Sequence, residues 1–270
     1  MAGLRLNDLA LLEFGTTINL EVEPGSSVCI VGPAGAGKSR LLRSIARLEK
    51  PTRGAVEGPA AFRAEPFGRK TKVQEVGRRR GNVGPNEQTE VLSALGLWEV
   101  RQQFVEELPK ELFIACEIAE ELMSESMLLV WDGKLDVVDP ITRSGAMRLI
   151  GSNPTRNVVV TSNNLEACAC FDYVIVLREY QSCFAGKTGD LAARDGVRSI
   201  EIESHMQPGL RALTEPFRAQ VTREGSKIRI VAEEGQDLAA SLLRDGYGDI
   251  RLLVTERRSL QEIILEMLRS

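Results

Sequence analysis

Eight residues near the N-terminus have the types and spacing needed to bind phosphate, Gly32-Pro33-Ala34-Gly35-Ala36-Gly37-Lys38-Ser39. They match the pattern G-x-x-x-x-G-K-[ST]. Glycines allow the backbone to curl around a phosphate so that its N–H groups point inward. The pattern predicts that Lys38 neutralises the outer phosphates of a nucleotide and that the Ser39 hydroxyl binds Mg²⁺.

The segments on either side of this loop agree with that interpretation. Ser27–Val31 is an apolar, β-branched run typical of a buried strand, and Arg40–Leu48 has apolar residues at helical spacing. A helix that begins at the loop adds the positive end of its dipole. The alternative is a chance glycine-rich turn. We expect the nucleotide to be contacted by Gly32, Pro33, Ala34, Gly35, Ala36, Gly37, Lys38, Ser39 and Arg40.

A carboxylate at the end of another strand would complete such a site by holding the Mg²⁺ shell. Asp132 closes the apolar run Leu128–Trp131 and fits that role, so Ser39 and Asp132 are the predicted metal-binding residues. The alternative is that Asp132 is only a strand-end or turn residue.

Composition excludes several other classes of function. The 270 residues are 43% hydrophobic and 27% charged with a net charge of -4, so nucleic acid is not an expected partner. Arg78-Arg79-Arg80 is interpreted as a solvated loop or helix face. Five cysteines and one histidine leave little capacity for a Cys/His metal site. No apolar run spans a membrane and no signal-peptide pattern is present, so we expect a cytoplasmic protein.

The order of the remaining segments predicts an α/β fold. Strands alternate with helices, which implies a mostly parallel, covered sheet. The predicted strands are a hairpin over Leu4–Val22, a short strand near Ala60, and Met127–Asp132, Asn157–Thr161 and Tyr173–Leu177. The predicted helices are Glu87–Leu95, Val100–Glu107, Lys110–Met123 and Arg143–Ile150.

The alternation of strands and helices changes near Asp195-Gly196, where we place a domain boundary. The order β-α-β-β-α-β plus one helix then matches a small ferredoxin-like α+β unit. Its predicted segments are Val197–Glu203, Gly209–Leu213, Ala219–Thr222, Lys227–Ala232, Gln236–Arg244, Ile250–Val254 and Ser259–Leu268. The predicted domains are 1–194, with a helical insert at about 70–125, and 195–270.

An ordered set of segments resembles the ATP-binding subunit of ATP-binding cassette (ABC) transporters over roughly residues 4 to 190. After the phosphate loop come Leu41–Gly54, Leu108-Pro109-Lys110-Glu111-Leu112, Leu128–Gly133, Val138-Asp139-Pro140 and Val159–Ser162. The C-terminal unit is similar to an accessory domain of many bacterial exporter ATPase subunits. The resemblance implies a P-loop nucleotide-binding domain that binds Mg·ATP and pairs with a second such domain. It also implies an integral membrane partner and a peripheral position on the inner face of the cell membrane.

The chain departs from the family pattern where hydrolysis is performed. The family's glutamate, which polarises the attacking water, is replaced by Gly133, and the histidine that contacts the terminal phosphate is replaced by Ser162. The family's signature segment corresponds here to Leu108–Leu112. In it Pro109 lacks a backbone N–H donor, and Lys110-Glu111 add bulk. Glu65 lies nearest the family's Mg²⁺-sensing glutamine. The family's base-stacking aromatic residue is assigned to Phe14, whose alternative is a place in the hairpin core.

These differences predict an ATP-binding subunit whose hydrolysis is weak or absent. Losing a general base and transition-state contacts removes on the order of 10²–10⁴-fold in rate for each group, while the ground-state binding groups remain. Asp136 is the one candidate replacement base, and its alternative is a solvated loop acid. The alternative functions are a soluble regulatory or scaffold pseudo-ATPase without a membrane partner, and an unrelated P-loop enzyme.

Overall fold

The computed structural model describes residues 3–62, 65–78, 83–193, 197–203, 214, 220–224, 227–231, 252–257 and 259–269. The chain divides into two compact units, Met1–Thr188 and Gly189–Ser270.

A five-stranded sheet forms the centre of the first unit, with the strand order β5-β6-β3-β7-β8. Its strands are β3 (Ser27–Val31), β5 (Leu128–Asp132), β6 (Asn157–Ser162), β7 (Tyr173–Arg178) and β8 (Gln181–Lys187). The first four are parallel, and every residue of β3 and β6 is buried, as expected for a covered parallel sheet. The predicted strands of this sheet are confirmed. The antiparallel edge strand β8 was not predicted.

A smaller antiparallel sheet has the order β2-β1-β4. It consists of β1 (Leu4–Ala10), β2 (Ile18–Val22) and β4 (Arg53–Glu57). The predicted N-terminal hairpin is confirmed, but the strand expected near Ala60 lies earlier, at Arg53–Glu57. The buried leucines of β1, Leu4, Leu6 and Leu9, join one core cluster with β3 and the following helix.

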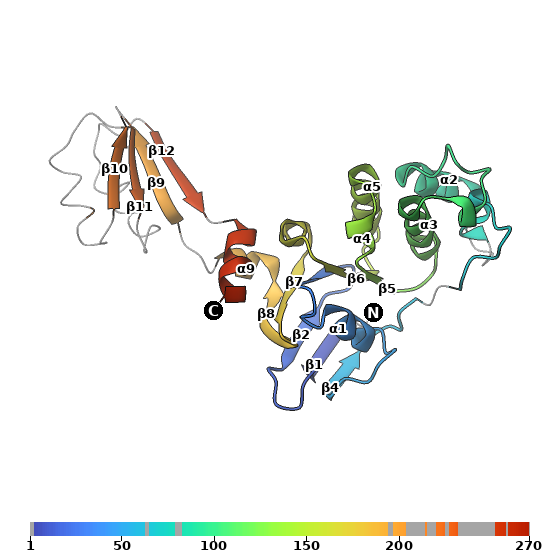
Figure 1. Cartoon of the computed structure of the whole chain (residues 1–270), viewed down its shortest axis with the longest axis horizontal. Coiled ribbons are helices and arrows are strands. Elements are labelled where there is room, and N and C mark those ends of the chain that lie inside the picture. The colour runs from blue at the N-terminus through green and yellow to red at the C-terminus, as the bar shows by residue number, and fades with distance from the viewer. Residues whose placement is uncertain are drawn as a thin grey trace. The chain divides into compact units, whose positions relative to one another are not determined.

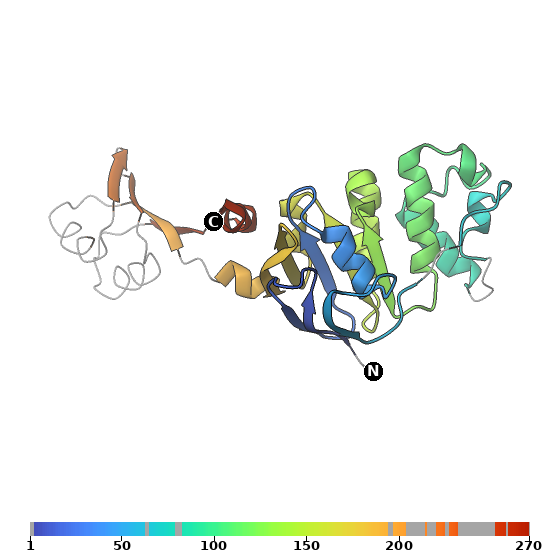
Figure 2. The ribbon, with the colours of Figure 1, turned by 60° about the horizontal axis from the view of Figure 1, so that its bottom comes forward.

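One helix lies against the central sheet, and a group of helices lies beside it (Figures 1 and 2). Helix α1 (Lys38–Ile45) packs against β3, β5 and β6. The helices α2 (Pro85–Ala94), α3 (Lys110–Leu122) and α5 (Pro140–Gly151) pack against one another, and the short α4 (Lys134–Val137) packs against α3 and β6. The helix predicted over Val100–Glu107 is wrong in extent, since only the 3₁₀ turn η3 (Val105–Glu107) forms. Two further 3₁₀ turns are η1 (Val73–Glu75) and η4 (Leu165–Cys170).

The second unit contains an antiparallel sheet with the order β10-β11-β9-β12. The strands are β9 (Val197–Glu203), β10 (Gln220–Glu224), β11 (Lys227–Val231) and β12 (Leu252–Arg257), flanked by α6 (Thr188–Ala193) and α9 (Leu260–Arg269). β9 and β10 lie on opposite sides of β11, and each is antiparallel to it. The helices predicted at Gly209–Leu213 and Gln236–Arg244 lie outside the described residues. None of the described helices is long and apolar enough to cross a membrane.

Candidate nucleotide-binding site

The phosphate loop connects β3 to α1 through a backbone that only glycine adopts readily. Gly32, Gly35 and Gly37 have φ angles of 152°, 79° and 96°. A Cβ atom on Gly32 would lie 2.1 Å from the Leu177 carbonyl oxygen, and one on Gly37 would lie 2.7 Å from a ring carbon of Tyr180. The loop is therefore packed closely against β7 and the turn that follows it.

The ammonium group of Lys38 lies over the loop itself. Its Nζ donates hydrogen bonds of 2.7 and 2.8 Å to the carbonyl oxygens of Gly32 and Pro33. Partial burial lowers the pKa of Lys38, while the nearby carboxylates of Asp136 and Asp132 act in the opposite direction. A phosphate in the loop would supply this cation with a further anionic partner.

Ser39 and Asp132 lie together, as predicted for a metal site. The Ser39 hydroxyl donates to Asp132 Oδ1 at 2.9 Å, and the Thr161 hydroxyl donates to the same oxygen at 2.6 Å. The backbone N–H of Gly133 donates to Thr161 Oγ1 at 2.8 Å. Because Asp132 and Thr161 are paired across β5 and β6, the parallel register itself places this cluster beside the loop.

These residues fit Mg²⁺, which prefers oxygen ligands and is usually bound through one or two protein groups plus substrate phosphates. A hydroxyl and a carboxylate oxygen 2.9 Å apart at the edge of the phosphate loop supply such a partial set. Among the described residues no group of three or more His, Cys, Asp and Glu side chains is placed to hold a metal ion. The remaining ligands would have to come from the nucleotide and from water.

A cavity of about 430 Å³ runs along the loop. It is lined by Ala34, Gly35, Gly37, Lys38, Ser39, Arg40, Arg43, Asp132, Gly133, Asp136, Thr161, Ser162, Asn163 and Tyr180. Asp136 accepts hydrogen bonds from the Ser162 hydroxyl at 2.6 Å and from the Asn163 backbone N–H at 2.8 Å. The structure therefore brings the candidate base Asp136 to the cavity and pairs it with Ser162, which the resemblance places at the position of the family's histidine.

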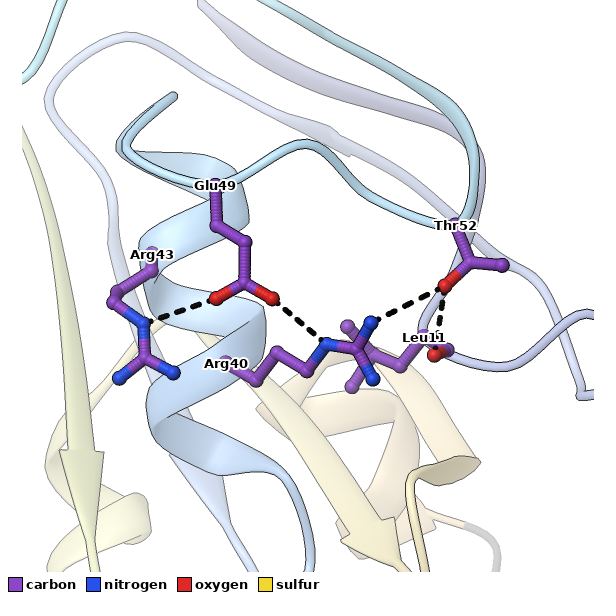
Figure 3. Close-up of polar contacts among 5 residues, drawn as sticks. All are labelled: Leu11, Arg40, Arg43, Glu49 and Thr52. Carbon is purple, nitrogen blue, oxygen red and sulfur yellow. Dashed lines mark hydrogen bonds and ion pairs between the residues drawn. The ribbon is translucent and has the colours of Figure 1, made fainter.

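Arg40 lines the cavity, but its guanidinium is hydrogen-bonded to two residues that follow α1 (Figure 3). Its Nε donates to Glu49 at 2.9 Å, and a terminal nitrogen donates to Thr52 at 3.4 Å. Arg43 donates to the other oxygen of Glu49 at 3.1 Å, and Thr52 donates to the Leu11 carbonyl at 2.9 Å. The hydrogen bond from Arg43 is the largest influence that lowers the pKa of Glu49.

Two residues assigned from the resemblance lie away from the cavity lining. Phe14 lies in the connection between β1 and β2 and is 96% exposed, so it does not belong to the hairpin core. Glu65 is exposed in an irregular segment. Neither is among the lining residues of the cavity, and their roles stay predictions. Thr161 and Tyr180 were not predicted as site residues, although Thr161 ends one predicted strand and Tyr180 lies three residues beyond another.

The position after Asp132 offers no side chain to the cavity. Gly133 has a φ of 65°, and the next residue, Lys134, is directed to α3. Lys134 Nζ lies 2.6 Å from Glu121 and 3.0 Å from Glu117, and the indole N–H of Trp131 donates to Glu121 at 2.7 Å. This cluster fixes the junction of β5 and α4 to the helix that follows the signature segment.

The signature segment itself opens α3. Pro109 is the N-cap of the helix and receives no side-chain cap, and Lys110 and Glu111 are exposed on its first turn. Proline carries no backbone N–H, so the helix start presents one donor fewer than a small residue would.

The comparisons with known proteins agree with this geometry. A family model described as "ABC transporter" matches residues 16–134. The aliphatic sulfonates import ATP-binding protein SsuB 1 of Rhodococcus jostii (strain RHA1) is 30% identical over 191 residues, which cover 66% of this chain and 77% of that protein. SsuB 3 of Pseudomonas syringae pv. tomato (strain ATCC BAA-871 / DC3000) is 31% identical over 183 residues, covering 61% of this chain and 67% of that protein.

Solved structures show the same fold at lower identity. The structure of an ATP-binding subunit of an ABC transporter has a TM-score of 0.59 at 18% identity, covering 72% of this chain and 93% of that one. A nucleotide-free ATP-binding cassette from an ABC transporter has a TM-score of 0.54 at 19% identity, covering 69% and 92%. With its P-loop fold, its phosphate loop and its curated relatives, the chain belongs to the family of ABC transporter ATP-binding proteins.

Proposed function

We propose that this chain is the ATP-binding subunit of an ABC importer and that it binds Mg·ATP but hydrolyses it slowly. The single observation that carries the proposal is the contrast within one cavity. Lys38, Ser39 and Asp132 are all in place to bind phosphates and metal, whereas Gly133 provides no carboxylate where the family places its base.

The proposed direction of transport rests on the names of the relatives rather than on the C-terminal unit. The resemblance of that unit to an exporter accessory domain led to the expectation of an exporter. The curated relatives named above are import ATP-binding proteins, which favours an importer.

Slow hydrolysis follows from general acid–base chemistry. A positioned base contributes on the order of 10²–10⁴-fold to such a rate. Asp136 is the carboxylate available to substitute, but its oxygens accept hydrogen bonds from Ser162 and Asn163. Both of its carboxylate oxygens are therefore already hydrogen-bonded within the protein. When bound, Mg²⁺ would neutralise charge on the phosphate oxygens, and Ser39 and Asp132 would hold it.

The proposed partners are those of the family. An integral membrane subunit and a second ATP-binding domain, identical or different, would place the chain on the inner face of the cell membrane. Co-purification with a multi-span membrane protein would support this. A stable particle that never enters the membrane fraction would favour a regulatory pseudo-ATPase instead, which the altered start of α3 at Pro109 makes the second candidate.

The first test is a paired measurement on the purified full chain, with Lys38→Ala as the control. Mg·ATP affinity and steady-state phosphate release are determined for both proteins. We expect the unmodified chain to bind ATP, the control to lose binding, and phosphate release to be negligible in both. Release at ordinary ABC rates that the control abolishes would contradict the proposal.

Asp136→Asn tests whether the residual rate depends on the one carboxylate that could act as base. If Asp136 takes the proton, this variant loses whatever turnover the chain has while its ATP affinity stays the same. Unchanged turnover would exclude Asp136 as a base.

A further inference from the structure

Tyr180 is an aromatic residue on the cavity that no sequence motif assigns. It lies in the two-residue turn between β7 and β8, lines the same cavity as Lys38, and is 39% exposed. Its backbone N–H donates to the Ala36 carbonyl at 2.9 Å, which attaches the turn to the phosphate loop. The ring lies so close to Gly37 that a Cβ atom there would be 2.7 Å from it.

The turn holds this ring in a conformation that glycine would adopt at lower cost. Glu179 and Tyr180 have φ angles of 50° and 65°, and two positive values are what a tight hairpin turn requires. Asparagine and glycine are the residues usually found at these positions. A large side chain in such a conformation, at the edge of a ligand cavity, points to a role for the side chain itself.

The order of the strands places the ring on the nucleoside side of the site. Asp132 ends β5, Thr161 and Ser162 end β6, the phosphate loop follows β3, and Tyr180 follows β7. Adjacent strands are about 4.8 Å apart, so the metal-binding oxygens and Tyr180 lie on opposite sides of the loop. A nucleotide whose terminal phosphates lie near Asp132 extends its base away from the acids.

We propose that the nucleoside base stacks on the ring of Tyr180, an inference that rests on the proposed binding of ATP. Tyr180 is 39% exposed and lines the cavity beside the predicted phosphate loop, and purines stack favourably on aromatic side chains. Phe14 is not among the lining residues. The inference places the base contact on the β7–β8 turn, whereas the family resemblance places it on Phe14 in the N-terminal hairpin.

The test compares affinities for Mg·ATP and Mg·tripolyphosphate, which shares the phosphates but has no base. Calorimetry is run on the unmodified full chain and on Tyr180→Gly, Tyr180→Phe, Phe14→Ala and Glu179→Gly. Glycine adopts positive φ angles at lower conformational cost than glutamate or tyrosine. Neither glycine variant should therefore lower the melting temperature. Tyr180→Gly should weaken ATP binding roughly 10-fold or more without changing tripolyphosphate binding. Tyr180→Phe and Glu179→Gly should bind ATP like the unmodified chain.

Several results would overturn the inference. Equal losses for ATP and tripolyphosphate in Tyr180→Gly would mean that the ring only supports the loop. A loss in Tyr180→Phe as large as in Tyr180→Gly would assign the contact to the hydroxyl. A loss of ATP affinity in Phe14→Ala, with no loss in the Tyr180 variants, would show that the base contacts the N-terminal hairpin instead. In these cases ATP binding that Lys38→Ala abolishes leaves the proposed function standing, whereas no ATP binding by the unmodified chain overturns both.

Discussion

Two strand-to-helix junctions at the same edge of the central sheet share the dipeptide Gly-Lys, but their lysines have different partners. Gly37-Lys38 joins β3 to α1, and Gly133-Lys134 joins β5 to α4. In both, the glycine is the N-cap of the helix with a positive φ, 96° and 65°. The first lysine lies over the phosphate loop, and the second is paired with carboxylates on α3.

The neighbours of a lysine, rather than its local motif, decide whether it is available to a ligand. Lys38 has backbone carbonyls as its partners, and a phosphate can add a stronger, charged partner. Lys134 has two carboxylates within 3.0 Å, and its side chain is only 17% exposed. One junction therefore serves binding and the other serves stability.

Lys134→Met should have the largest effect, a loss of about 3–5 kcal/mol in the free energy of unfolding, because it leaves the buried Glu121 carboxylate without its cation. Glu121 is the more buried of the two partners, with a side chain 6% exposed. Chemical denaturation measures the loss. The double variant Lys134→Met with Glu121→Gln should recover part of it, and additive losses would show that the two residues are not coupled.

The same variant should be sensitive to pH in a defined direction. Burial raises the pKa of Glu121, and Lys134 is the main influence that opposes this rise. Without Lys134 the ionised carboxylate is penalised more, so the stability loss is largest above the raised pKa. It should shrink as the pH falls from neutral toward the ordinary value of 4.5, where the carboxyl becomes neutral.

Lys38→Met, the matched change at the other junction, should reverse this pattern. The pKa of Lys38 is lowered by burial, so its charge is not favoured by folding, and removing it should not reduce the free energy of unfolding. Losing charged hydrogen bonds to phosphate should cost about 3 kcal/mol of ATP binding, roughly 100-fold in affinity. Calorimetry and denaturation on one preparation separate the two effects. A large stability loss would remove the distinction between the junctions.

Gly133→Glu restores the carboxylate that the second junction lacks. A Cβ atom at Gly133 meets no other atom within 4 Å, although the positive φ costs about 1 kcal/mol of stability. We expect the rate of phosphate release to rise by about 10²-fold, the lower end of a general base contribution. Gly133→Gln is the matched control, and an equal rise in both variants would rule out base catalysis.

Asp139→Ala should have the smallest effect, about 1 kcal/mol of stability, because Asp139 caps α5 after the second junction. It accepts backbone N–H bonds from Ile141 at 2.8 Å and from Thr142 at 3.1 Å. A hydrogen bond from the Thr142 hydroxyl is the largest influence that lowers its pKa. The cap therefore stabilises the fold above the ordinary pKa of 3.8, and the two proteins should converge in stability as the pH falls below it.

Much of the fold followed from the sequence because its strands are short apolar runs. Val158–Val160 and Val174–Leu177 are recognisable without structural context, and the parallel sheet that they form is confirmed. β8 was missed because it is an edge strand with one fully buried residue, Phe184, so it lacks a continuous apolar pattern. The limits of β4 were missed because its residues are mostly exposed.

Only the site residues that belong to local sequence motifs could be predicted. The phosphate loop and Asp132 follow from patterns of a few residues, and the structure brings Ser39 and Asp132 together. Thr161 joins them through the register of β5 against β6, which no local pattern records. Tyr180 reaches the cavity through a turn whose partner, Ala36, lies far away in the sequence. Such contacts depend on which strands become neighbours.

The fully buried indole of Trp131 makes the second junction visible to fluorescence. The chain contains two tryptophans, and the other, Trp98, is half-buried with the Arg101 guanidinium 4.6 Å above its ring. In a Trp98→Phe background all indole emission would come from the residue directly before Asp132. Its hydrogen bond to Glu121 makes that emission responsive to the local field. Movement of this junction when Mg·ATP binds could then be followed in real time without an added dye.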